Sequence, residues 1–530
     1  MKIVTADEMR EIEQRAAEIG LPSEVLMEHA GLSIARKINE ELECVVGHSI
    51  LILIGPGNNG GDGLVAARHL HDWGARIQLY FPKQRADSDP NYQEICKRDI
   101  PCLWAECPNS LATVLSSTEV VVDSLFGTGT SRPLKEVYKE TLDSVRDARE
   151  FNPQLMVIAI DLPSGLNPDT GGVDHSCLAC DLTITLAYPK VGLFAFPGAS
   201  KVGELVVGDI GIPPTLADNI NTEITVAADA ENMLPERSPY ANKGTFGKTL
   251  VVAGSINYVG AAYLASVAAT RVGAGLVTLA TAHSIYPILA SKLIEVTHLP
   301  LPESGTGTIG PEASELVEAA LREYDVMLLG CGLGQNVSTQ QFIESILFSL
   351  PESPPKIVLD ADALNILARI PQWWGKLPQN MVLTPHPGEM SRLSGISVDD
   401  IQADRLGMAR KLAALWHKTV VLKGANTVVV APDGRASICP SANPALASAG
   451  TGDVLAGIIA GLLSQGLSLF DAATLGTYIH AQAGELLRSE MGEAGVLASD
   501  MLPILPLVIK ELKEHNNSTL DDERSLCLCK

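Results

Sequence analysis

The sequence contains little positive charge and no long uninterrupted apolar segment. Only 39 residues are Lys or Arg, against 62 Asp or Glu, so the formal net charge is −23, and no basic cluster stands out. This acidity argues against nucleic acids or anionic membranes as the main partners. No apolar run approaches the roughly 20 residues that are needed to span a bilayer. We therefore expect the partners to be small molecules.

The sequence also shows no signal-peptide pattern and no cysteine set at zinc spacing. Residues 1–20 are charged and amphipathic, without the apolar core or cleavage site of a signal peptide. The ten cysteines mostly stand alone, and the pairs Cys177/Cys180 and Cys527/Cys529 have no second ligand pair at zinc spacing. These absences predict reduced thiols and a cytoplasmic protein.

The length and composition predict an α/β protein with more than one domain. A chain of 530 residues, 46% of them hydrophobic, exceeds what a single core usually supports. Two halves each open with an apolar strand, a glycine-rich turn and a helix, and a Pro-, Asp- and Asn-rich passage near residues 212–239 separates them. We expect domains at residues 1–220 and 236–512, a linker at 221–235 and a polar tail at 513–530.

Alternation of strands and helices predicts a parallel, doubly wound sheet, which binds ligands at the carboxyl ends of its strands. In the first half we expect helical residues 6–40, a turn at 55–63, a helix to about residue 73, and strands at 50–54, 120–123, 156–161 and 182–187. In the second half we expect an Ala-rich helix from about residue 261 and strands at 249–254, 276–280, 326–330, 357–360, 381–384, 419–422 and 427–431.

Three of the predicted strand ends in the first half carry a glycine turn, an Asn or Asp and, in two cases, a hydroxyl. They read GPGNNGGDG from Gly55, DSLFGTG from Asp123 and DLPSG from Asp161. The first is neither a dinucleotide fingerprint nor a phosphate-binding loop with a Lys-Ser/Thr pair. Its adjacent Asn58 and Asn59 offer oxygens to a hard cation or a polar ligand edge. Each segment alone is most often a turn, but three at one sheet edge favour a ligand site.

These segments closely resemble those of the NAD(P)H-hydrate epimerases, over about residues 1–220. The resemblance implies a Rossmann-like fold that interconverts the R and S epimers of the hydrated dinucleotides NADHX and NADPHX, with bound K⁺. It implies that Asn59, Asp123 and Ser164 contact K⁺, and that Asp161 lies at the reacting ring as a candidate acid or base. The residues that it implies for substrate contact are Asn58, Asn59, Gly60, Gly61, Asp62, Gly127, Thr128, Gly129, Thr130, Ser131, Arg132, Pro133 and Asp161.

In the second half, the turn at residues 449–452 delivers Asp453 to the first turn of an apolar helix. Unpaired amides and the helix dipole attract a phosphate there, and glycines allow close approach. Asp453 can take a proton from a hydroxyl that attacks phosphorus. The motif therefore indicates phosphoryl transfer, although Asp453 as a simple helix cap is the alternative that it leaves open.

Other strand ends of the second half add polar groups. Lys423 to Thr427 links two strands and offers a cation, open backbone and a hydroxyl to phosphates. His386 lies in the segment TPHPGE, whose prolines hold it in an extended loop. A lone His is more often structural than functional, but this one has the position of a substrate contact.

The second half resembles the ADP-dependent or ATP-dependent NAD(P)H-hydrate dehydratases of the ribokinase-like superfamily, over about residues 235–510. The matching segments include GxxxYxGAA, LDADALN, TPHPGE, KGANT and NPxxAxxGxGD, and Cys331 stands where Pro is usual in GPGLG. The resemblance implies an α/β domain in which Lys423, Gly424, Ala425, Asn426, Thr427 and Gly452 bind the nucleotide. It also implies that Ala261, Gly332, His386 and Asp453 bind the hydrate, while Asp360 and Asp362 help with Mg²⁺ or structure.

The fused arrangement resembles the bacterial form, which implies ADP as the phosphoryl donor. Asp453 would deprotonate the carbinol at C6 of the S hydrate, phosphorylation would create a good leaving group, and elimination would restore NADH or NADPH with release of AMP and phosphate. The expected cofactors are K⁺ and Mg²⁺, the substrates are NADHX, NADPHX and ADP, and we expect a homo-oligomer.

Two other interpretations compete. A small-molecule kinase of the same superfamily would share the chemistry up to phosphoryl transfer, but it has no need of the first half. Alternatively, the first half is a non-catalytic nucleotide sensor or protein-binding module. Its complete set of Asn58, Asn59, Asp123 and Asp161 disfavours that interpretation.

Overall fold

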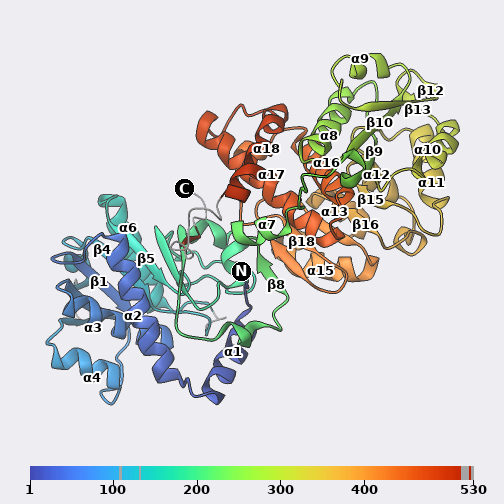
Figure 1. Cartoon of the computed structure of the whole chain (residues 1–530). Coiled ribbons are helices and arrows are strands. Elements are labelled where there is room, and N and C mark those ends of the chain that lie inside the picture. Colours follow the sequence, from blue (N-terminus) through green and yellow to red (C-terminus); the bar gives the residue numbers. More distant parts are fainter. Residues whose placement is uncertain (107–109, 130–132, 515–524, 527–530) are drawn as a thin grey trace. The chain divides into compact units, whose positions relative to one another are not determined.

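A computed structural model describes residues 1–106, 110–129, 133–514 and 525–526. The chain divides into two compact units (Figure 1), and the boundary lies between Ile220 and Asn221. The first unit also includes residues 525–526, and the second extends through the helix that ends at Glu514. Among the described residues, no helix has both the length and the hydrophobicity to cross a membrane.

The first unit is built on a sheet of eight strands. Its strand order is β20-β7-β6-β5-β4-β1-β2-β3, with every neighbouring pair parallel except β20 with β7. The strands are β1 (Ser49–Ile54), β2 (Arg76–Phe81), β3 (Cys102–Trp104), β4 (Val120–Ser124), β5 (Met156–Ile160), β6 (Leu182–Leu186), β7 (Glu204–Gly208) and β20 (Ser525–Leu526). The helices are α1 (Ala6–Glu18), α2 (Ser23–Glu41), α3 (Asn58–Asp72), α4 (Pro90–Lys97), α5 (Ser110–Leu115) and α6 (Glu136–Phe151). The predicted parallel, doubly wound sheet is confirmed.

The strand order reverses between β1 and β4, and this places the candidate site. Ile54 at the end of β1 is paired with Ser124 at the end of β4, while β5 follows on the far side of β4. Connections that leave β1 and β4 run to opposite sides of the sheet, which opens a crevice at their carboxyl ends. All three predicted ligand segments follow β1, β4 or β5, so they converge on this crevice.

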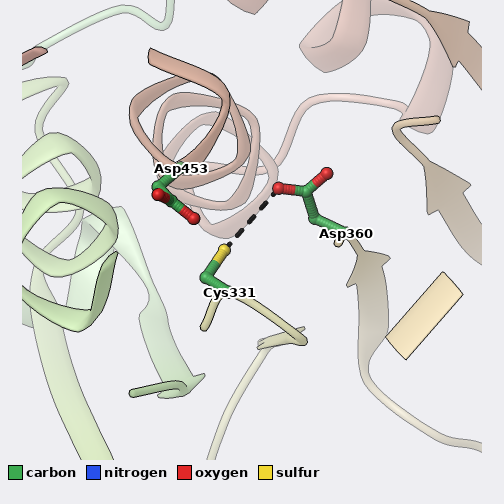
Figure 2. A group of neighbouring side chains, drawn as sticks. All are labelled: Cys331, Asp360 and Asp453. Carbon is green, nitrogen blue, oxygen red and sulfur yellow. Dashed lines mark hydrogen bonds between the residues drawn. The ribbon is translucent and has the colours of Figure 1, made fainter. Parts of the chain in front are cut away.

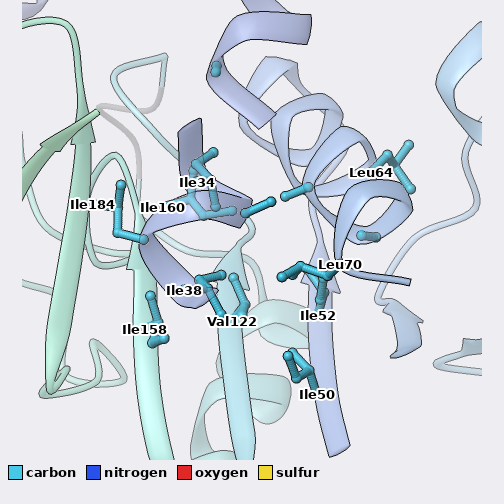
Figure 3. Packing of buried hydrophobic residues seen from close by; sticks show 14 of the residues in the cluster. Ile34, Ile38, Ile50, Ile52, Leu64, Leu70, Val122, Ile158, Ile160 and Ile184 are labelled. Carbon is cyan, nitrogen blue, oxygen red and sulfur yellow. The ribbon is translucent and has the colours of Figure 1, made fainter. Parts of the chain in front are cut away.

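Both faces of this sheet are buried, which explains why its strands read as continuous apolar runs. On one face, Ile50, Ile52, Val122, Ile158, Ile160 and Ile184 pack against side chains of α2 and α3 such as Ile34, Ile38, Leu64 and Leu70 (Figure 3). On the other face, the alternate residues, including Leu51, Val121 and Val157, pack against α6. The two layers fix the strand ends in place.

The structure corrects one local expectation in the first unit. Residues 58–63 were expected in a turn, but α3 already begins at Asn58, so they form its first turns. A Cβ added to Gly60 would lie 2.0 Å from the carbonyl oxygen of Gly55, and one added to Gly63 would lie 2.3 Å from Ser124 Oγ. These glycines therefore allow the helix to approach the sheet closely, and they do not break the helix.

The second unit has a sheet of ten strands in the order β11-β10-β9-β14-β15-β16-β17-β18-β19-β8. The strands are β8 (Thr222–Ile224), β9 (Lys248–Val252), β10 (Leu276–Ala282), β11 (Thr297–Leu301), β14 (Val326–Leu329), β15 (Lys356–Leu359), β16 (Met381–Leu383), β17 (Thr419–Leu422), β18 (Val428–Val430) and β19 (Ala436–Ile438), with a separate hairpin of β12 (Glu303–Gly305) and β13 (Thr308–Ile309). From β11 to β17 all neighbours are parallel, and β18 turns back antiparallel to β17.

The helices of this unit are α7 (Ala227–Met233), α8 (Val259–Arg271), α9 (Tyr286–Ala290), α10 (Ser314–Leu321), α11 (Val337–Phe348), α12 (Asp362–Leu367), α13 (Pro387–Ser394), α14 (Val398–Ala403), α15 (Arg405–Trp416), α16 (Thr451–Ser464), α17 (Leu469–Met491) and α18 (Ala498–Glu514). Residues 221–235, expected as a linker, contain β8 and α7, and β8 pairs with β19 as the edge strand of the sheet. A strand of three residues is too short to give a readable alternation. In the expected polar tail, β20 pairs with β7, and residues 515–524 and 527–530 lie outside the described residues.

Helix α16 packs against α8 through small residues. A Cβ on Gly457 would lie 2.3 Å from the carbonyl oxygen of Ala265, and one on Gly461 would lie 2.6 Å from that of Ala269. The glycines therefore bring the two helix backbones together. This packing fixes the start of α16, with Asp453 in its first turn, above the strand ends.

Candidate active sites

The first unit has a cavity of about 560 Å³ at the crevice. Its wall includes Asn58, Asn59 and Asp62 of α3, Thr128 and Gly129 after β4, Asp161 after β5, and Lys190 after β6. Helix α1 closes another side with Glu13 and Gln14. Gly127 and Pro133 border a neighbouring cavity of about 340 Å³ that shares Phe126 and Gly127 with the first. The predicted contacts Thr130, Ser131 and Arg132 lie outside the described residues.

Asp161 is held in one orientation by groups around its carboxylate. Its backbone φ is +66°. This angle lies in the left-handed region, where a residue other than glycine is strained. The Oδ1 atom is paired with the Lys190 ammonium and accepts from Leu186 N at 3.3 Å and Thr185 Oγ1 at 3.4 Å. Oδ2 lies toward Gly127, where an added Cβ would be 3.0 Å away. In the described chain no donor reaches Oδ2, so this oxygen faces the cavity.

Lys190 was not predicted from the sequence. Its side chain is 1% exposed, and its ammonium contacts Asp161, the carbonyl oxygen of Leu186 at 3.0 Å and Thr185 Oγ1 at 3.4 Å. Three acceptors therefore satisfy the three donors of this buried cation. Lys190 lies 29 residues from Asp161, and only the pairing of β5 with β6 brings the two together.

Asp62 has surroundings opposite to those of Asp161. Burial, followed by the negative charges of Asp161 and Glu13, raises the pKa of Asp62 well above its usual value. Burial also raises the pKa of Glu13, which lines the same cavity. The cavity thus contains one ion-paired carboxylate and one buried carboxyl group that favours its protonated form.

The residues expected to hold K⁺ occupy the ends of α3, β4 and β5. Asp123 is fully buried, accepts from Ser164 N at 2.8 Å and Ser164 Oγ at 2.7 Å, and has its pKa raised by burial. No Lys or Arg in the described chain pairs with it. Asn59 donates from Nδ2 to the carbonyl oxygen of Ile160 at 3.2 Å, and its Oδ1 lies beside Gly127. A buried carboxylate without a cationic partner, together with amide and hydroxyl oxygens, fits a monovalent cation.

Gly60 and Gly61 do not line the cavity. They lie beside Arg85, a residue that was not predicted from the sequence. Arg85 donates to the carbonyl oxygen of Gly55 at 2.8 Å and to Asp89 at 2.6 Å. A Cβ on Gly60 would be 2.9 Å from its guanidinium. The loop after β2 therefore supplies a cation beside the amino-terminal end of α3, and no local motif marks it.

In the second unit, Lys423 is the centre of a charged cluster at the ends of β15, β16 and β17. Its ammonium is 2.7 Å from Asp360 Oδ1 and 3.8 Å from Glu389 Oε2. Burial acts to lower the pKa of Lys423, but the charges of Asp360 and Glu389 outweigh it and raise that pKa. Asp360 also accepts from Thr384 Oγ1 at 2.7 Å. Sequence analysis left Asp360 outside the main site, whereas the structure places it beside Lys423.

Figure 2 shows Asp453, Cys331 and Asp360 turned toward one another from α16, the turn after β14 and the end of β15. The Cys331 thiol donates to Asp360 Oδ2 at 3.8 Å, and one ligand atom of each residue lies within 4.8 Å of the others. Burial, and then the charge of Asp360, raises the pKa of Asp453 to about 6. Asp453 is therefore a weak base near neutral pH, which suits proton transfer.

His480 of α17 contacts the first turn of α16 and stabilises it. His480 Nε2 is 2.9 Å from the carbonyl oxygen of Thr451, and burial lowers the pKa of His480 to about 4. The neutral ring therefore donates from Nε2 to this carbonyl. A Cβ on Gly452 would be 3.5 Å from Lys423 Nζ, so the free amides of the helix and the ammonium border the same space.

The residues expected to bind the hydrate are divided between two places. Gly332 has φ of +64°, and an added Cβ would be 2.8 Å from Ala261 Cβ, so these two meet. His386 is half-exposed at the start of α13, and its Nδ1 accepts from Gly388 N at 3.0 Å. The missed residue here is Glu389, whose carboxylate accepts from His386 N at 2.8 Å and whose pKa burial raises to about 7.

The segment from Lys423 to Thr427 forms a tight connection between β17 and β18. Asn426 has φ of +51°, and Thr427 Oγ1 donates to the carbonyl oxygen of Gly424 at 2.8 Å. Arg405 at the start of α15 donates to the carbonyl oxygens of Leu422 at 2.9 Å and Lys423 at 3.2 Å. Arg405 therefore stabilises the connection. Because Arg405 lies 17 and 18 residues before its two partners in the sequence, no local motif predicted this role.

The carboxylates of this site also fit Mg²⁺. Asp360 and Asp453 repel each other enough to raise the pKa of Asp453, and a hard divalent cation with oxygen ligands would relieve that repulsion. Asp362 is less suited because its oxygens accept from Gly334 N at 2.8 Å and Gln335 Nε2 at 2.9 Å. The Cys331 sulfur is a soft ligand that Mg²⁺ does not favour.

Comparisons with known proteins match both units. Residues 249–507 match the family described as NAD(P)H-hydrate dehydratase, and residues 23–192 match the family described as YjeF-related protein N-terminus. Over 526 residues the chain is 39% identical to the bifunctional NAD(P)H-hydrate repair enzyme Nnr of Moorella thermoacetica, with 97% of this chain and 98% of that protein covered. It is 37% identical over 528 residues to the protein of that name from Thermofilum pendens, with 98% of each covered.

Solved structures resemble the second unit. An ADP/ATP-dependent NAD(P)H-hydrate dehydratase from Bacillus subtilis, co-crystallised with ATP/Mg²⁺, is 32% identical, with a TM-score of 0.48, and covers 55% of this chain and 99% of its own. A ribokinase-like superfamily protein from Enterococcus faecalis is 25% identical, with a TM-score of 0.49, and covers 55% of this chain and 96% of its own.

Proposed function

The chain belongs to the family of bifunctional NAD(P)H-hydrate repair enzymes, and from this membership we propose how its two sites divide the reaction. It is an enzyme with NAD(P)H-hydrate epimerase and dehydratase activities. This division of the reaction is supported by one observation, that each unit has its own charged site. The site contains Asp161 and Lys190 in the first unit and Asp453 and Lys423 in the second.

We assign epimerisation to the cavity of the first unit. Asn58, Asn59 and Asp62 border the hydrated dinucleotide on one side and the segment after β4 borders it on the other. The reacting ring lies against Oδ2 of Asp161, the oxygen that faces the cavity. Asn59, Asp123 and Ser164 would hold K⁺, whose charge balances the buried carboxylate of Asp123.

We assign dehydration to the strand ends of the second unit. Lys423 and the amides at the start of α16 bind the phosphates of the nucleotide, since the two border one space. Asp453 takes the proton of the C6 hydroxyl as that oxygen attacks phosphorus. The phosphorylated oxygen then leaves as phosphate, with loss of a proton from the ring carbon next to C6, and NADH or NADPH is formed. Ala261, Gly332 and His386 border the hydrate.

Asp360 would hold Mg²⁺ beside Asp453, and the ion would supply positive charge to neutralise the transferring phosphoryl group. ADP is the donor that we propose, with AMP as product, because the chain shares the fused arrangement of its relatives. Fusion suits this chemistry, since the dehydratase accepts one epimer and the epimerase converts the other into it.

The decisive experiment uses purified protein and a mixture of R and S NADHX. NADH absorbance is followed with ADP, with ATP freed of ADP, or with no nucleotide, and AMP is quantified at the end. We expect complete recovery with ADP, much slower recovery with ATP and none without nucleotide. Equal rates with ADP and purified ATP would contradict the proposed donor, and phosphorylation without NADH would favour a small-molecule kinase.

Two expectations about the whole protein stay predictions. The first is a homo-oligomer, which sedimentation equilibrium of the full chain measures directly. The second is a cytoplasmic location, and fractionation of producing cells tests it.

A further inference from the structure

The cavity of the first unit contains two carboxyl groups whose roles the structure separates. Asp161 has one oxygen held by Lys190, Thr185 and Leu186 and the other directed at the cavity. Asp62 lies on α3 in the same wall, is 7% exposed and forms no ion pair in the described chain. Asp161 is therefore ion-paired and held in one orientation, whereas Asp62 is buried without an ion-pair partner in the described chain.

The charges that face Asp62 come from four elements. Asp161 follows β5, Glu13 is on α1, Lys190 follows β6 and Arg85 follows β2. Burial and the two carboxylates raise the pKa of Asp62, and the two cations act in the opposite direction with smaller effect. An ion-paired carboxyl group and an unpaired, buried one in the wall of the same cavity form the arrangement of a general base with a general acid.

We propose that Asp62 is the general acid, and Asp161 the general base, of an epimerisation that opens and recloses the C6–N1 bond of the hydrate. This inference rests on the proposed epimerase function and adds to it a residue and a route. Lys190 is a positioning residue, because it acts on the substrate only through Asp161.

Every atom in this route is accounted for. Asp161 Oδ2 takes the proton of the C6 hydroxyl, the C6–N1 electron pair moves to N1, and N1 takes the proton of Asp62. The products are a planar C6 aldehyde and an N1–H group. Rotation about the C5–C6 bond exposes the other face of the aldehyde. N1 then attacks C6, returns its proton to Asp62, and the C6 oxygen takes the proton from Asp161, which restores both carboxyl groups.

Burial favours this route over loss of hydroxide from C6. Ring opening converts one neutral species into another, and it needs one acid and one base and no water. Loss of hydroxide would create a cationic ring and a separate anion against a wall of buried residues such as Asp62 and Asp161, where separated charges are costly.

The test uses the full chain, with Asp62→Asn compared with the control variant Glu11→Gln, which removes an exposed carboxyl group of α1 outside the cavity. Pure R NADHX is incubated without nucleotide, and the appearance of S is followed by chromatography at several pH values and in water labelled with ¹⁸O. Circular dichroism and thermal melts report whether the first unit of each variant is folded. ADP-dependent dehydration of S hydrate by the same samples controls for the amount of active protein, since Asp62 and Glu11 lie in the other unit.

We expect Asp62→Asn to lower kcat for epimerisation by about 10²–10⁴-fold with little change in KM, and Glu11→Gln to retain wild-type activity. In the wild type the rate should fall at high pH as Asp62 loses its proton, and Asp62→Asn should lack this fall. The C6 oxygen should be retained. Near-wild-type kcat in Asp62→Asn would overturn the role of Asp62, and one solvent oxygen gained per inversion would overturn ring opening. A wild type that does not epimerise would instead refute the proposed function itself.

Discussion

At the scale of single residues, Asp453 combines burial with a neighbouring negative charge, and this sets the pH range in which it is a base. Its pKa is about 6, and a base must be ionised to accept a proton, so dehydration should lose rate as the pH falls through about 6. Asp453→Asn should lower the ADP-dependent rate by about 10²–10⁴-fold. Recovery of NADH absorbance from S hydrate measures both effects. An Asn variant with near-wild-type turnover would remove Asp453 from the mechanism.

Cys331 gives a second test at this scale. The Cys331 thiol, which donates to Asp360, also lies close to Asp453 and acts to lower the pKa of Asp453. Cys331→Ala removes that donor, so the acid side of the dehydration profile should move to higher pH, whereas Cys331→Ser keeps a donor and should stay close to wild type. The measurement is kcat for dehydration against pH. An Ala variant with an unchanged profile would show that the thiol does not influence Asp453.

At the scale of elements, the contact between α16 and α8 carries the second active site. A Cβ on Gly457 would lie 2.3 Å from a backbone oxygen of α8, whereas one on Gly260 in α8 has open space. Gly457→Ala should therefore lower the free energy of unfolding by about 1–3 kcal/mol through overpacking and slow dehydration by shifting Asp453. Gly260→Ala is the matched control and should be neutral or stabilising in thermal melts. Equal stability of the two variants would mean that α16 has room to move.

Elements differ in how far the sequence could predict them. The central strands and the glycine turns after them were predictable because apolar runs and turn residues are local features. The start of α3 at Asn58 was missed, since the glycines there look like a turn until the neighbouring sheet is known. The contact of Lys190 with Asp161 depends on strand order, which no local pattern specifies. The same holds for the contact of Lys423 with Asp360, which are 63 residues apart. Short edge strands such as β8 and β20 give no periodic signal.

At the scale of the whole molecule, the two sites are tied to separate sets of strands, each with its own core. The first depends on β1, β4 and β5, and the second on β14 to β17 with α16. Every group that holds Asp161 belongs to the first unit, and every group that holds Asp453 belongs to the second. A substitution in one site should therefore leave the chemistry of the other intact.

This independence predicts complementation between two defective full-length variants. Asp161→Ala should convert S hydrate to NADH with ADP and then stall, with R hydrate left over except for slow spontaneous epimerisation. Asp453→Asn should interconvert R and S but form almost no NADH. Mixing the two proteins should restore complete recovery, because the S epimer released by one is a free substrate for the other. NADH absorbance and chromatography of the remaining epimers follow the course. If the mixture stalls like Asp161→Ala alone, Asp453→Asn has lost epimerase activity and the two sites are not independent. If Asp161→Ala alone consumes both epimers at the wild-type rate, Asp161 has no part in the reaction.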